Sequence, residues 1–341
     1  MYFMPLLTET EQAADRLRGL ARVTSLIQSA ALESVTGAKV YLKLETEQPT
    51  KSCKIRSAGN QMLANLNEAR LRGIVTASTG NNAIAHGYLC NRLGVKGVAF
   101  LPKMTDVEKA QLVEQAGLQV HFYGSDIVDS EIEARRYAFE TGAIYHSPYN
   151  DKNAIAGQAT IAKEITEQLR KADFVLATIG GGGLAAGIAG YLAAAKYGAQ
   201  VVGCLPEASP TMAKSIEAGK IVKTIQRPSI SDSSGGIEED SITFDYCFRL
   251  LSRMMIQVSE DEIKRAMNFM YRHGNIVLEG AGAIPVAALL KRRDIFKGYT
   301  IVLCLCGSNI GRELFSECIA NFFVPDGLEI DAGQSLMATP K

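Results

Sequence analysis

The stretch at positions 51–58 reads Lys51-Ser52-Cys53-Lys54-Ile55-Arg56-Ser57-Ala58. Residues 40–45, shortly before it, alternate apolar and polar side chains, which is typical of a half-buried strand. A turn at 48–50 follows, and apolar residues recur at helical spacing from Ile55. Lys54 is therefore expected in the first turn of a helix, close to the positive end of the helix dipole. An ammonium is disfavoured there, and a neutral amine is what a lysine needs to trap a carbonyl.

The composition is that of an ordinary globular chain. Of 341 residues, 47% are apolar and 21% are charged, and a chain of this length usually forms about two domains. The 36 basic and 36 acidic residues cancel, so no net field draws the chain to nucleic acid or anionic lipid. The most apolar stretch, 184–195, is too short to cross a bilayer, and no signal-peptide pattern is recognised. We expect neither a nucleic-acid partner nor a membrane.

The cysteines indicate a reducing compartment. There are seven of them, scattered singly apart from Cys304 and Cys306, and the chain has four histidines and no CxxC pair. This pattern gives neither a disulfide framework nor a zinc site. A cytoplasmic location is therefore expected.

Short apolar runs alternate with helical patterns from residue 73 to residue 149 and predict a small parallel sheet covered by helices. The expected strands are 74–77, 98–101, 120–123 and 143–145, and the expected helices are 82–93, 106–116 and 129–141. A second α/β block of the same kind runs from about residue 154 to 306. An entry helix is expected at 8–19 with Thr8 as its cap, and the irregular composition of 326–341 predicts a loosely held tail.

Four consecutive glycines, Gly180, Gly181, Gly182 and Gly183, follow a predicted strand and open a predicted helix. Successive glycine amides can point inward as a nest, and the helix dipole adds to the attraction for an anion, so the segment suits a phosphate. It is not a P-loop, because no Gly-Lys-Ser/Thr ends it. The alternative is a tight joint between strand and helix, although four glycines in a row cost backbone entropy.

Three further segments combine polar side chains with a predicted strand end or helix start. Hydroxyls, amides and a helix N-terminus together can bind a carboxylate, and strand ends of α/β proteins face ligands. The alternative for each is ordinary helix capping. The segments are Ser78-Thr79-Gly80-Asn81-Asn82, Cys306-Gly307-Ser308-Asn309 and Glu279-Gly280-Ala281-Gly282.

In this order the segments resemble the pyridoxal-phosphate enzymes of fold type II, specifically the serine/threonine dehydratase and serine racemase family. The similarity covers about residues 10 to 320. The matching motifs are residues 43–45 and 48–56 around the lysine, the substrate loop 78–82, and two further signatures at 155–158 and 279–283.

The resemblance implies an α/β fold of the tryptophan synthase β type, with two domains built on parallel or mixed sheets. The large, cofactor-binding domain would comprise residues 1–65 plus 151–325, and the small domain residues 66–150. Pyridoxal 5'-phosphate would lie in the cleft between them. The family also implies a homodimer.

The resemblance further implies a role for each matched position. Lys54 would bind the cofactor as a Schiff base and act as the catalytic base. The phosphate would be held by Gly180, Gly181, Gly182, Gly183 and Leu184, and the rest of the cofactor by Asn81, Glu279 and Cys306. The substrate would be bound by Ser78, Thr79, Gly80, Asn82 and Gly236.

The chain departs from the family pattern at several positions. Cys53 stands where phenylalanine is usual, Asn82 where histidine is usual, and Cys306 where serine or threonine is usual. Thr79 replaces the serine that serves racemases as the second acid/base, and its extra methyl disfavours racemisation. The carboxylates that bind a cation in many relatives are replaced by Leu205, Ser209 and Thr211, so no metal is expected.

These features favour a dehydratase, or ammonia-lyase, that converts a threonine- or serine-like β-hydroxy amino acid to a 2-oxo acid and ammonia. The stretch Ser234-Gly235-Gly236-Ile237 suggests the subgroup that resembles the ectoine/hydroxyectoine-utilisation dehydratase. Three alternatives stay open: an amino-acid racemase, a β-replacement enzyme similar to cysteine synthase, and a catalytically silent protein that binds the cofactor and acts by association.

Overall fold

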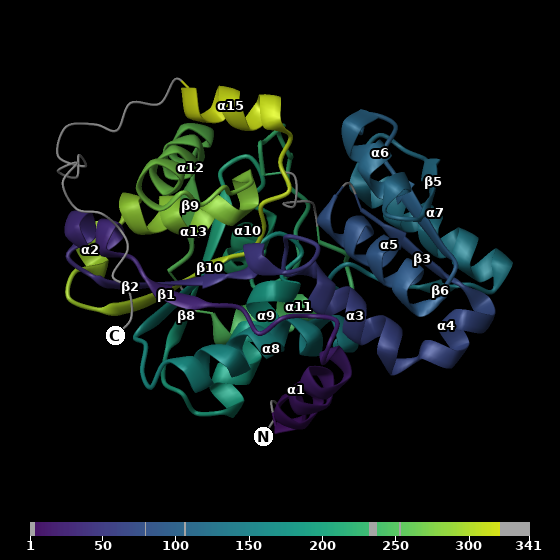
Figure 1. Cartoon of the computed structure of the whole chain (residues 1–341), viewed down its shortest axis with the longest axis horizontal. Coiled ribbons are helices and arrows are strands. Elements are labelled where there is room, and N and C mark those ends of the chain that lie inside the picture. The colour runs from purple at the N-terminus through teal and green to yellow at the C-terminus, as the bar shows by residue number, and fades with distance from the viewer. Residues whose placement is uncertain (1–3, 79, 106, 232–236, 252–253, 321–341) are drawn as a thin grey trace.

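The computed structural model describes residues 4–78, 80–105, 107–231, 237–251 and 254–320. Two separate sheets, each covered by helices on both faces, lie side by side (Figure 1). The predicted α/β class is confirmed. No helix in these ranges is long and apolar enough to cross a membrane.

The larger sheet has six strands, and its order is not the order of the chain. The outermost strand β1 is antiparallel to β2, and the other neighbours are parallel. Chain segments from both ends of the sequence therefore meet at its centre. The strand order is β1 (Leu26–Gln28), β2 (Lys39–Leu44), β10 (Thr300–Leu305), β7 (Phe174–Thr178), β8 (Gln200–Pro206) and β9 (Ile256–Val258).

Strand β10 shows how the larger sheet divides two hydrophobic cores. Ile301, Leu303 and Leu305 belong to one core, and Val302 and Cys304 belong to the other. Alternate residues of a strand point to opposite faces, so a strand that is apolar throughout is buried on both. The first core is closed by α2 (Ala30–Thr36), α12 (Glu260–Gly274) and α13 (Gly280–Lys291), and the second by α1 (Met4–Leu17), α8 (Lys152–Gln168), α9 (Gly183–Ala194) and α11 (Ile242–Leu250).

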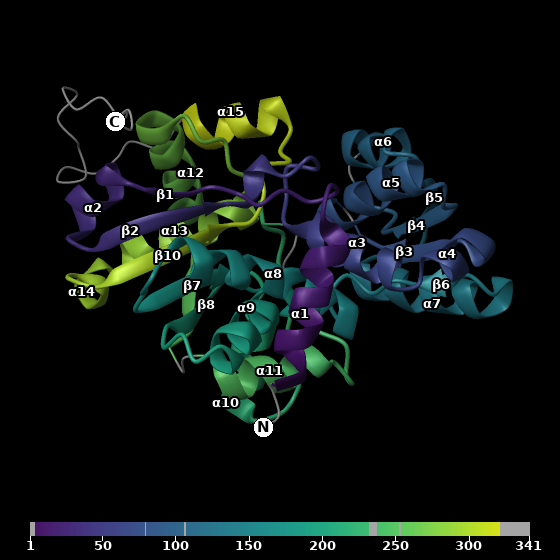
Figure 2. The ribbon, with the colours of Figure 1, turned by 60° about the horizontal axis from the view of Figure 1, so that its bottom comes forward.

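The smaller sheet has four strands, all parallel. Its order is β5 (Gln119–Phe122), β4 (Gly97–Leu101), β3 (Ile74–Ala77) and β6 (Ile144–Tyr145). Helices α5 (Asn81–Leu93) and α6 (Val107–Gln115) cover one face, and α7 (Ile127–Thr141) covers the other (Figure 2). The predicted small parallel sheet is confirmed.

Helix α3 (Lys54–Ala64) joins the two halves of the molecule. It begins at Lys54, as predicted, and packs against α8 of the larger half and α5 of the smaller half. Helix α4 (Leu66–Arg72) then leads into β3. The remaining elements are short: η1 (Glu45–Glu47), α10 (Thr211–Ala218), α14 (Arg293–Phe296) and α15 (Arg312–Ala320).

A buried cluster of charged side chains fixes the position of α3. The Arg56 guanidinium, 2% exposed, donates to Glu45 Oε2 at 2.7 Å and to Glu164 Oε1 at 2.6 Å. Lys43 Nζ, also buried, donates to Glu164 Oε2 at 2.6 Å. Burial alone would raise the pKa of Glu45, but Arg56, Thr24 and Lys43 together hold that pKa below its ordinary value. The cluster links β2, η1, α3 and α8.

Three sequence-based expectations are not confirmed. Thr8 is not a helix cap, because α1 extends from Met4 to Leu17 and Thr8 lies inside it. The predicted tail, residues 326–341, lies outside the described residues. The predicted domain limits stay a prediction, although the strands of the smaller sheet all fall between residues 66 and 150.

The charged cluster leads to a first prediction. Replacing Glu164 by alanine leaves Lys43 and Arg56 without a buried counter-charge, and we expect the free energy of unfolding to fall by about 3–5 kcal/mol. Urea unfolding measures this. Glu167→Ala on the same helix is the matched control: Glu167 pairs with Lys163 at the surface, and its loss is expected to cost less than about 1 kcal/mol. Equal losses in the two variants would contradict a structural role for the cluster.

Candidate active site

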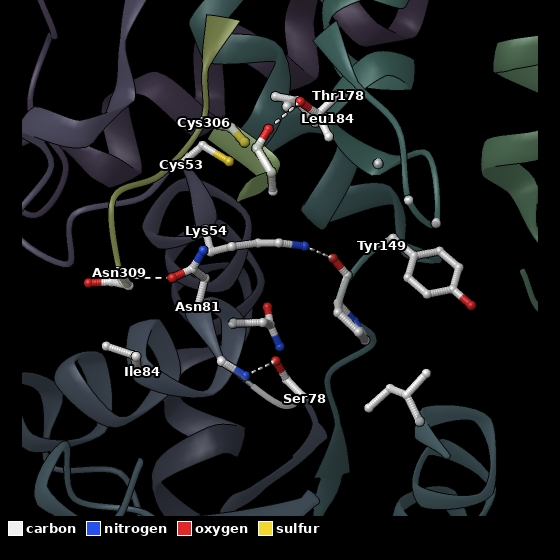
Figure 3. Close-up of a pocket in the computed structure, with 18 of the residues that line it drawn as sticks. Cys53, Lys54, Ser78, Asn81, Ile84, Tyr149, Thr178, Leu184, Cys306 and Asn309 are labelled. Carbon is white, nitrogen blue, oxygen red and sulfur yellow. Dashed lines mark hydrogen bonds between the residues drawn. The ribbon is translucent and has the colours of Figure 1, made fainter. Parts of the chain in front are cut away.

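One cavity collects all the predicted site residues that the structure describes. Its wall is formed by the start of α3, by the segments that follow β3, β7 and β10, and by the starts of α9 and α13 (Figure 3). The predicted residues in this wall are Lys54, Ser78, Gly80, Asn81, Asn82, Gly180, Gly181, Gly182, Gly183, Leu184, Glu279 and Cys306. Thr79 and Gly236 lie outside the described residues.

Lys54 is the first residue of α3, and its side chain crosses the cavity toward the segment that carries Tyr149 (Figure 3). Its Nζ donates to the carbonyl of Pro148 at 3.2 Å. Within the described residues it is the one lysine or arginine in the cavity wall. This amine is therefore the nucleophilic nitrogen that a ligand in the cavity would meet.

The tetraglycine segment forms a tight cradle between β7 and α9. Gly182 has φ +91°, a left-handed conformation that favours glycine, and a Cβ on Gly181 would lie 2.4 Å from the ring of Tyr149. Thr243 Oγ1 donates to the carbonyl of Gly181 at 2.6 Å and steadies the loop. The first turn of α9 adds N–H groups with no partner inside the helix. The cradle has the shape and dipole that a phosphate group needs.

The Asn81 amide is oriented by two neighbours. Its Nδ2 donates to Glu279 Oε1 at 2.6 Å, and its Oδ1 accepts from Asn309 Nδ2 at 2.6 Å. Asn309 is in turn anchored by a hydrogen bond to the carbonyl of Thr50 at 2.8 Å. The segments after β3 and β10 and the start of α13 are thus joined at the cavity wall, and the second hydrogen of Asn81 Nδ2 stays available to an acceptor.

Asn82 lines the cavity and has a buried side-chain oxygen without a partner in the described part of the chain. Thr76 Oγ1 donates its one hydrogen to the carbonyl of His146 at 2.8 Å, so it can only accept from Asn82 Nδ2, which lies 2.9 Å away. The amide nitrogen therefore faces Thr76. Asn82 Oδ1 is buried and has no hydrogen-bond partner among the described residues. A donor on a ligand would satisfy it.

Two thiols lie side by side at the end of β10 (Figure 3). The backbone N–H of Cys53 donates to the carbonyl of Cys306 at 2.9 Å. Burial raises the pKa of the Cys53 thiol to about 12 and that of Cys306 well above its ordinary value. Both sulfurs are therefore neutral at physiological pH, and a neutral thiol is only a weak hydrogen-bond donor.

Glu131, on α7, is a cavity residue that sequence reasoning missed. Its side chain is 4% exposed, and it accepts a hydrogen bond from Tyr149 Oη at 3.4 Å. Burial and the nearby carboxylate of Glu238 raise its pKa to about 8, against the weaker opposing effect of Arg135. No sequence motif marks this position, because a single glutamate in an amphipathic helical pattern looks like an ordinary surface residue.

A second network closes the cavity beside Glu131. Arg135 Nη2, one turn further along α7, pairs with Glu238 Oε1 at 2.5 Å. Glu238 Oε2 accepts from Asn150 Nδ2 at 2.5 Å, and its backbone N–H donates to Tyr149 Oη at 3.1 Å. The smaller half is thus tied to the segment that follows residue 236, and Arg135 is committed to Glu238 rather than to Glu131.

The raised pKa of Glu131 predicts a pH-dependent stability. The folded protein holds this proton up to about pH 8, whereas the unfolded chain releases it near pH 4.5. The stabilisation from the protonated carboxyl is therefore full below pH 4.5 and is lost as the pH rises toward 8. Glu131→Gln does not titrate, so we expect its stability relative to wild type to rise by up to about 1.4 kcal/mol per pH unit over that window.

Urea unfolding between pH 5 and 8 measures this trend. Glu133→Gln on the same helix is the matched control, because Glu133 pairs with Arg136 and stays ionised throughout this pH range. Its stability difference from wild type should not change with pH. A flat difference for Glu131→Gln as well would show that Glu131 is ionised in the folded protein.

Comparisons with known proteins agree with this geometry. The model of the family described as "Pyridoxal-phosphate dependent enzyme" matches residues 17–307. An L-threonine ammonia-lyase from Thermotoga maritima is 31% identical over 337 residues, which are 99% of this chain and 84% of that protein. A putative threonine dehydratase from Sinorhizobium fredii is 34% identical over 315 residues, covering 92% of this chain and 95% of the other.

Solved structures share the fold over most of the chain. The crystal structure of a pyridoxal 5'-phosphate-dependent aspartate racemase superimposes with a TM-score of 0.83 at 28% sequence identity. The match covers 90% of this chain and 96% of the racemase chain. The sequence-based resemblance to fold type II enzymes is thereby confirmed.

Proposed function

Because the chain belongs to the pyridoxal-phosphate-dependent enzyme family, we propose that it is an ammonia-lyase. Its substrate is a β-hydroxy amino acid of the threonine or serine kind, and its products are a 2-oxo acid and ammonia. The observation that carries the proposal is the meeting of the Lys54 amine and the tetraglycine cradle in one cavity. The names of the two relatives, an ammonia-lyase and a dehydratase, support the choice of reaction.

The cavity residues fit pyridoxal 5'-phosphate. Lys54 would hold the aldehyde carbon, and the amides of Gly180 to Gly183 with Leu184 would receive the phosphate, where a side chain on Gly181 would not fit. Asn81, kept in place by Glu279 and Asn309, would donate to the phenolic oxygen. Cys306, in the same cavity wall, would face the ring nitrogen. When bound, the cofactor supplies the electron sink for charge that develops at the substrate α-carbon.

The remaining residues bind and orient the substrate. Ser78 and the N-terminus of α5, which Gly80 caps, suit the substrate carboxylate, because a helix N-terminus attracts an anion. Asn82 offers its free Oδ1 to a donor on the substrate. We also assign Thr79 and Gly236 to the substrate site, on the family resemblance alone.

Two properties of the wall favour elimination. Lys54 is the one lysine or arginine among the described wall residues, and its amine would take the α-proton of a bound substrate. The Cys306 thiol, kept neutral by burial, is only a weak donor and would leave the ring nitrogen of a bound cofactor largely unprotonated, which would favour elimination over reprotonation.

The wider assignments follow the family. We propose a large cofactor-binding domain of residues 1–65 plus 151–325, a small domain of residues 66–150, a homodimer and a cytoplasmic location. The stretch Ser234–Ile237 supports a relation to the ectoine/hydroxyectoine-utilisation dehydratase subgroup. These assignments are independent of the reaction proposed above.

The proposal predicts a specific pair of results for wild type and Lys54→Ala. Wild type loaded with pyridoxal phosphate should release 2-oxo acid and ammonia in equal amounts from L-threonine or L-serine. Borohydride should then fix the cofactor covalently to residue 54, as mass spectrometry of the peptides would show. Lys54→Ala should lose both the covalent label and essentially all product, because it removes the nucleophile and the base together.

A panel of substrates distinguishes the alternatives in the same assay. Cofactor retained without any product from L-serine, L-threonine or their 3-hydroxy relatives would overturn the lyase assignment. Amino-acid racemisation is the second candidate, favoured by the likeness to the aspartate racemase structure. Chiral analysis would support it if D-amino acid formed as fast as 2-oxo acid. The extra methyl of Thr79 leads us to expect elimination to dominate.

Removal of metal provides a separate prediction. Leu205 is apolar and buried, and the Thr211 hydroxyl bonds to that of Thr224 at 2.6 Å, so neither offers the carboxylate that a divalent cation prefers. Activity should therefore be unchanged after EDTA treatment and dialysis. A loss of activity that Mg²⁺ restores would show that a cation site persists.

A further inference from the structure

We propose that His86 and His146 are positioning residues, which as a neutral pair hold the start of α5 in the shape that receives the substrate. The two imidazoles close a ring of hydrogen bonds with Asn82 and Thr76, and Asn82 belongs to the cavity wall. The inference rests on the proposed function, because it concerns the part of the wall that binds the substrate carboxylate. None of the roles assigned above uses either histidine.

Four residues from three parts of the smaller half form the ring. Asn82 Nδ2 lies 2.9 Å from Thr76 Oγ1, and Thr76 Oγ1 lies 2.8 Å from the carbonyl of His146. His146 Nδ1 lies 3.1 Å from His86 Nε2, and His86 Nδ1 lies 2.9 Å from the carbonyl of Asn82. The ring thus joins β3, the segment after β6 and the first two turns of α5.

The hydrogens of the ring follow from its chemistry. The Asn82 carbonyl can only accept, so His86 Nδ1 must carry a hydrogen. A neutral imidazole has one such hydrogen, which leaves His86 Nε2 as an acceptor and requires His146 Nδ1 to be the donor. A change of tautomer at either histidine would put two hydrogens or none between the two imidazoles. Each member of the ring therefore fixes the orientation of the next.

Both histidines are uncharged because they are buried. Their exposed fractions are 0% for His86 and 3% for His146. Burial, aided by the nearby Lys54, outweighs the hydrogen bond to the Asn82 carbonyl and lowers the pKa of His86 to about 4. Burial, with His86 beside it, also lowers the pKa of His146 well below its ordinary value. Near neutral pH each imidazole can therefore donate from one nitrogen and accept at the other.

The ring connects the start of α5 to the segment that contacts Lys54. Just beyond His146, the carbonyl of Pro148 accepts from Lys54 Nζ at 3.2 Å, and the carbonyl of Ser147 accepts from Gln61 of α3 at 3.0 Å. One piece of backbone therefore sets both the start of α5 and the surroundings of the lysine amine. A buried polar network whose members are all paired is rigid, so opening it should shift the start of α5 relative to Lys54.

Removal of one hydroxyl opens the ring with little change in volume. Thr76→Val leaves Asn82 Nδ2 and the carbonyl of His146 without their partner, whereas Thr76→Ser keeps the hydroxyl. Small displacements of positioning groups can cost about 100-fold in rate, so we expect Thr76→Val to lower kcat/KM for L-serine or L-threonine by at least about tenfold, mainly through KM. His86→Phe should show the same loss, and Thr76→Ser should stay within about threefold of wild type.

A matched control separates positioning from stability. Thr36 is also buried, and its hydroxyl donates to the carbonyl of Leu32 at 2.6 Å, but it lies on α2 and is not among the described wall residues. Thr36→Val should lower stability in urea without changing kcat/KM. The positioning role would be overturned if Thr76→Val also kept the wild-type kcat/KM, or if Thr76→Ser were as impaired as Thr76→Val.

Nitrogen-15 NMR of the imidazoles provides a readout that needs no activity. The chain has four histidines, so His86→Phe and His146→Phe suffice to assign the two signals of interest. From pH 6 to 8 we expect both imidazoles to carry their hydrogen on Nδ1 and neither to titrate. A hydrogen on His86 Nε2, or an imidazolium at either position in this range, would overturn the proposed ring.

Substrate binding distinguishes a failure of this inference from a failure of the proposed function. The absorbance of the cofactor-loaded protein reports binding of L-serine whether or not product forms. A wild-type protein that binds L-serine but releases no 2-oxo acid would refute the lyase assignment, and weaker binding by Thr76→Val would still support the ring. A Thr76→Val variant that binds L-serine as tightly as wild type would refute this inference alone.

Discussion

The buried ion cluster of Arg56, Glu45, Glu164 and Lys43 holds Lys54 and the start of α3 in place. Arg56 is two residues beyond Lys54, so its guanidinium fixes the first turn of α3 against η1 and α8. A charge this deeply buried is stable only with all its partners present. The position of Lys54 therefore depends on the larger sheet and on α8 at once, and the tetraglycine cradle that shares its cavity follows β7 of the same sheet.

The smaller half contacts the larger half through polar side chains as well as through α3. Arg135 and Glu238 join α7 to the segment after residue 236, and Asn81 joins the start of α5 to Glu279. The larger half thus contributes Lys54, the glycine cradle, Glu279 and Cys306 to the cavity wall, whereas the smaller half contributes Asn81, Asn82 and Glu131.

Sequence alone predicted the parts of the molecule that carry strong local signals. The βαβ periodicity between residues 73 and 149 identified the smaller sheet, and the same kind of pattern from about residue 154 to 306 identified the second α/β block. Short elements such as β1, β9 and α10 were not predicted, because three to eight residues show too little periodicity to recognise. Thr8 was misread as a cap because the spacing to Glu11 is also compatible with a helix interior, and packing against the second core extends α1 to Met4.

The site residues divide in the same way, into those that stand in a sequence motif and those that only the tertiary fold brings to the cavity. Lys54, Asn81 and Gly180 to Gly183 stand in motifs that are recognisable in the sequence, so they were predicted as site residues, and the structure brings them to one cavity wall. Glu131 could not be found, because a glutamate on an amphipathic helix is normally solvated, and only the tertiary fold buries it beside Glu238. A buried carboxyl with no dedicated cation lowers the stability of the folded protein at neutral pH. Strongly shifted pKa values of this kind are frequent in functional clefts.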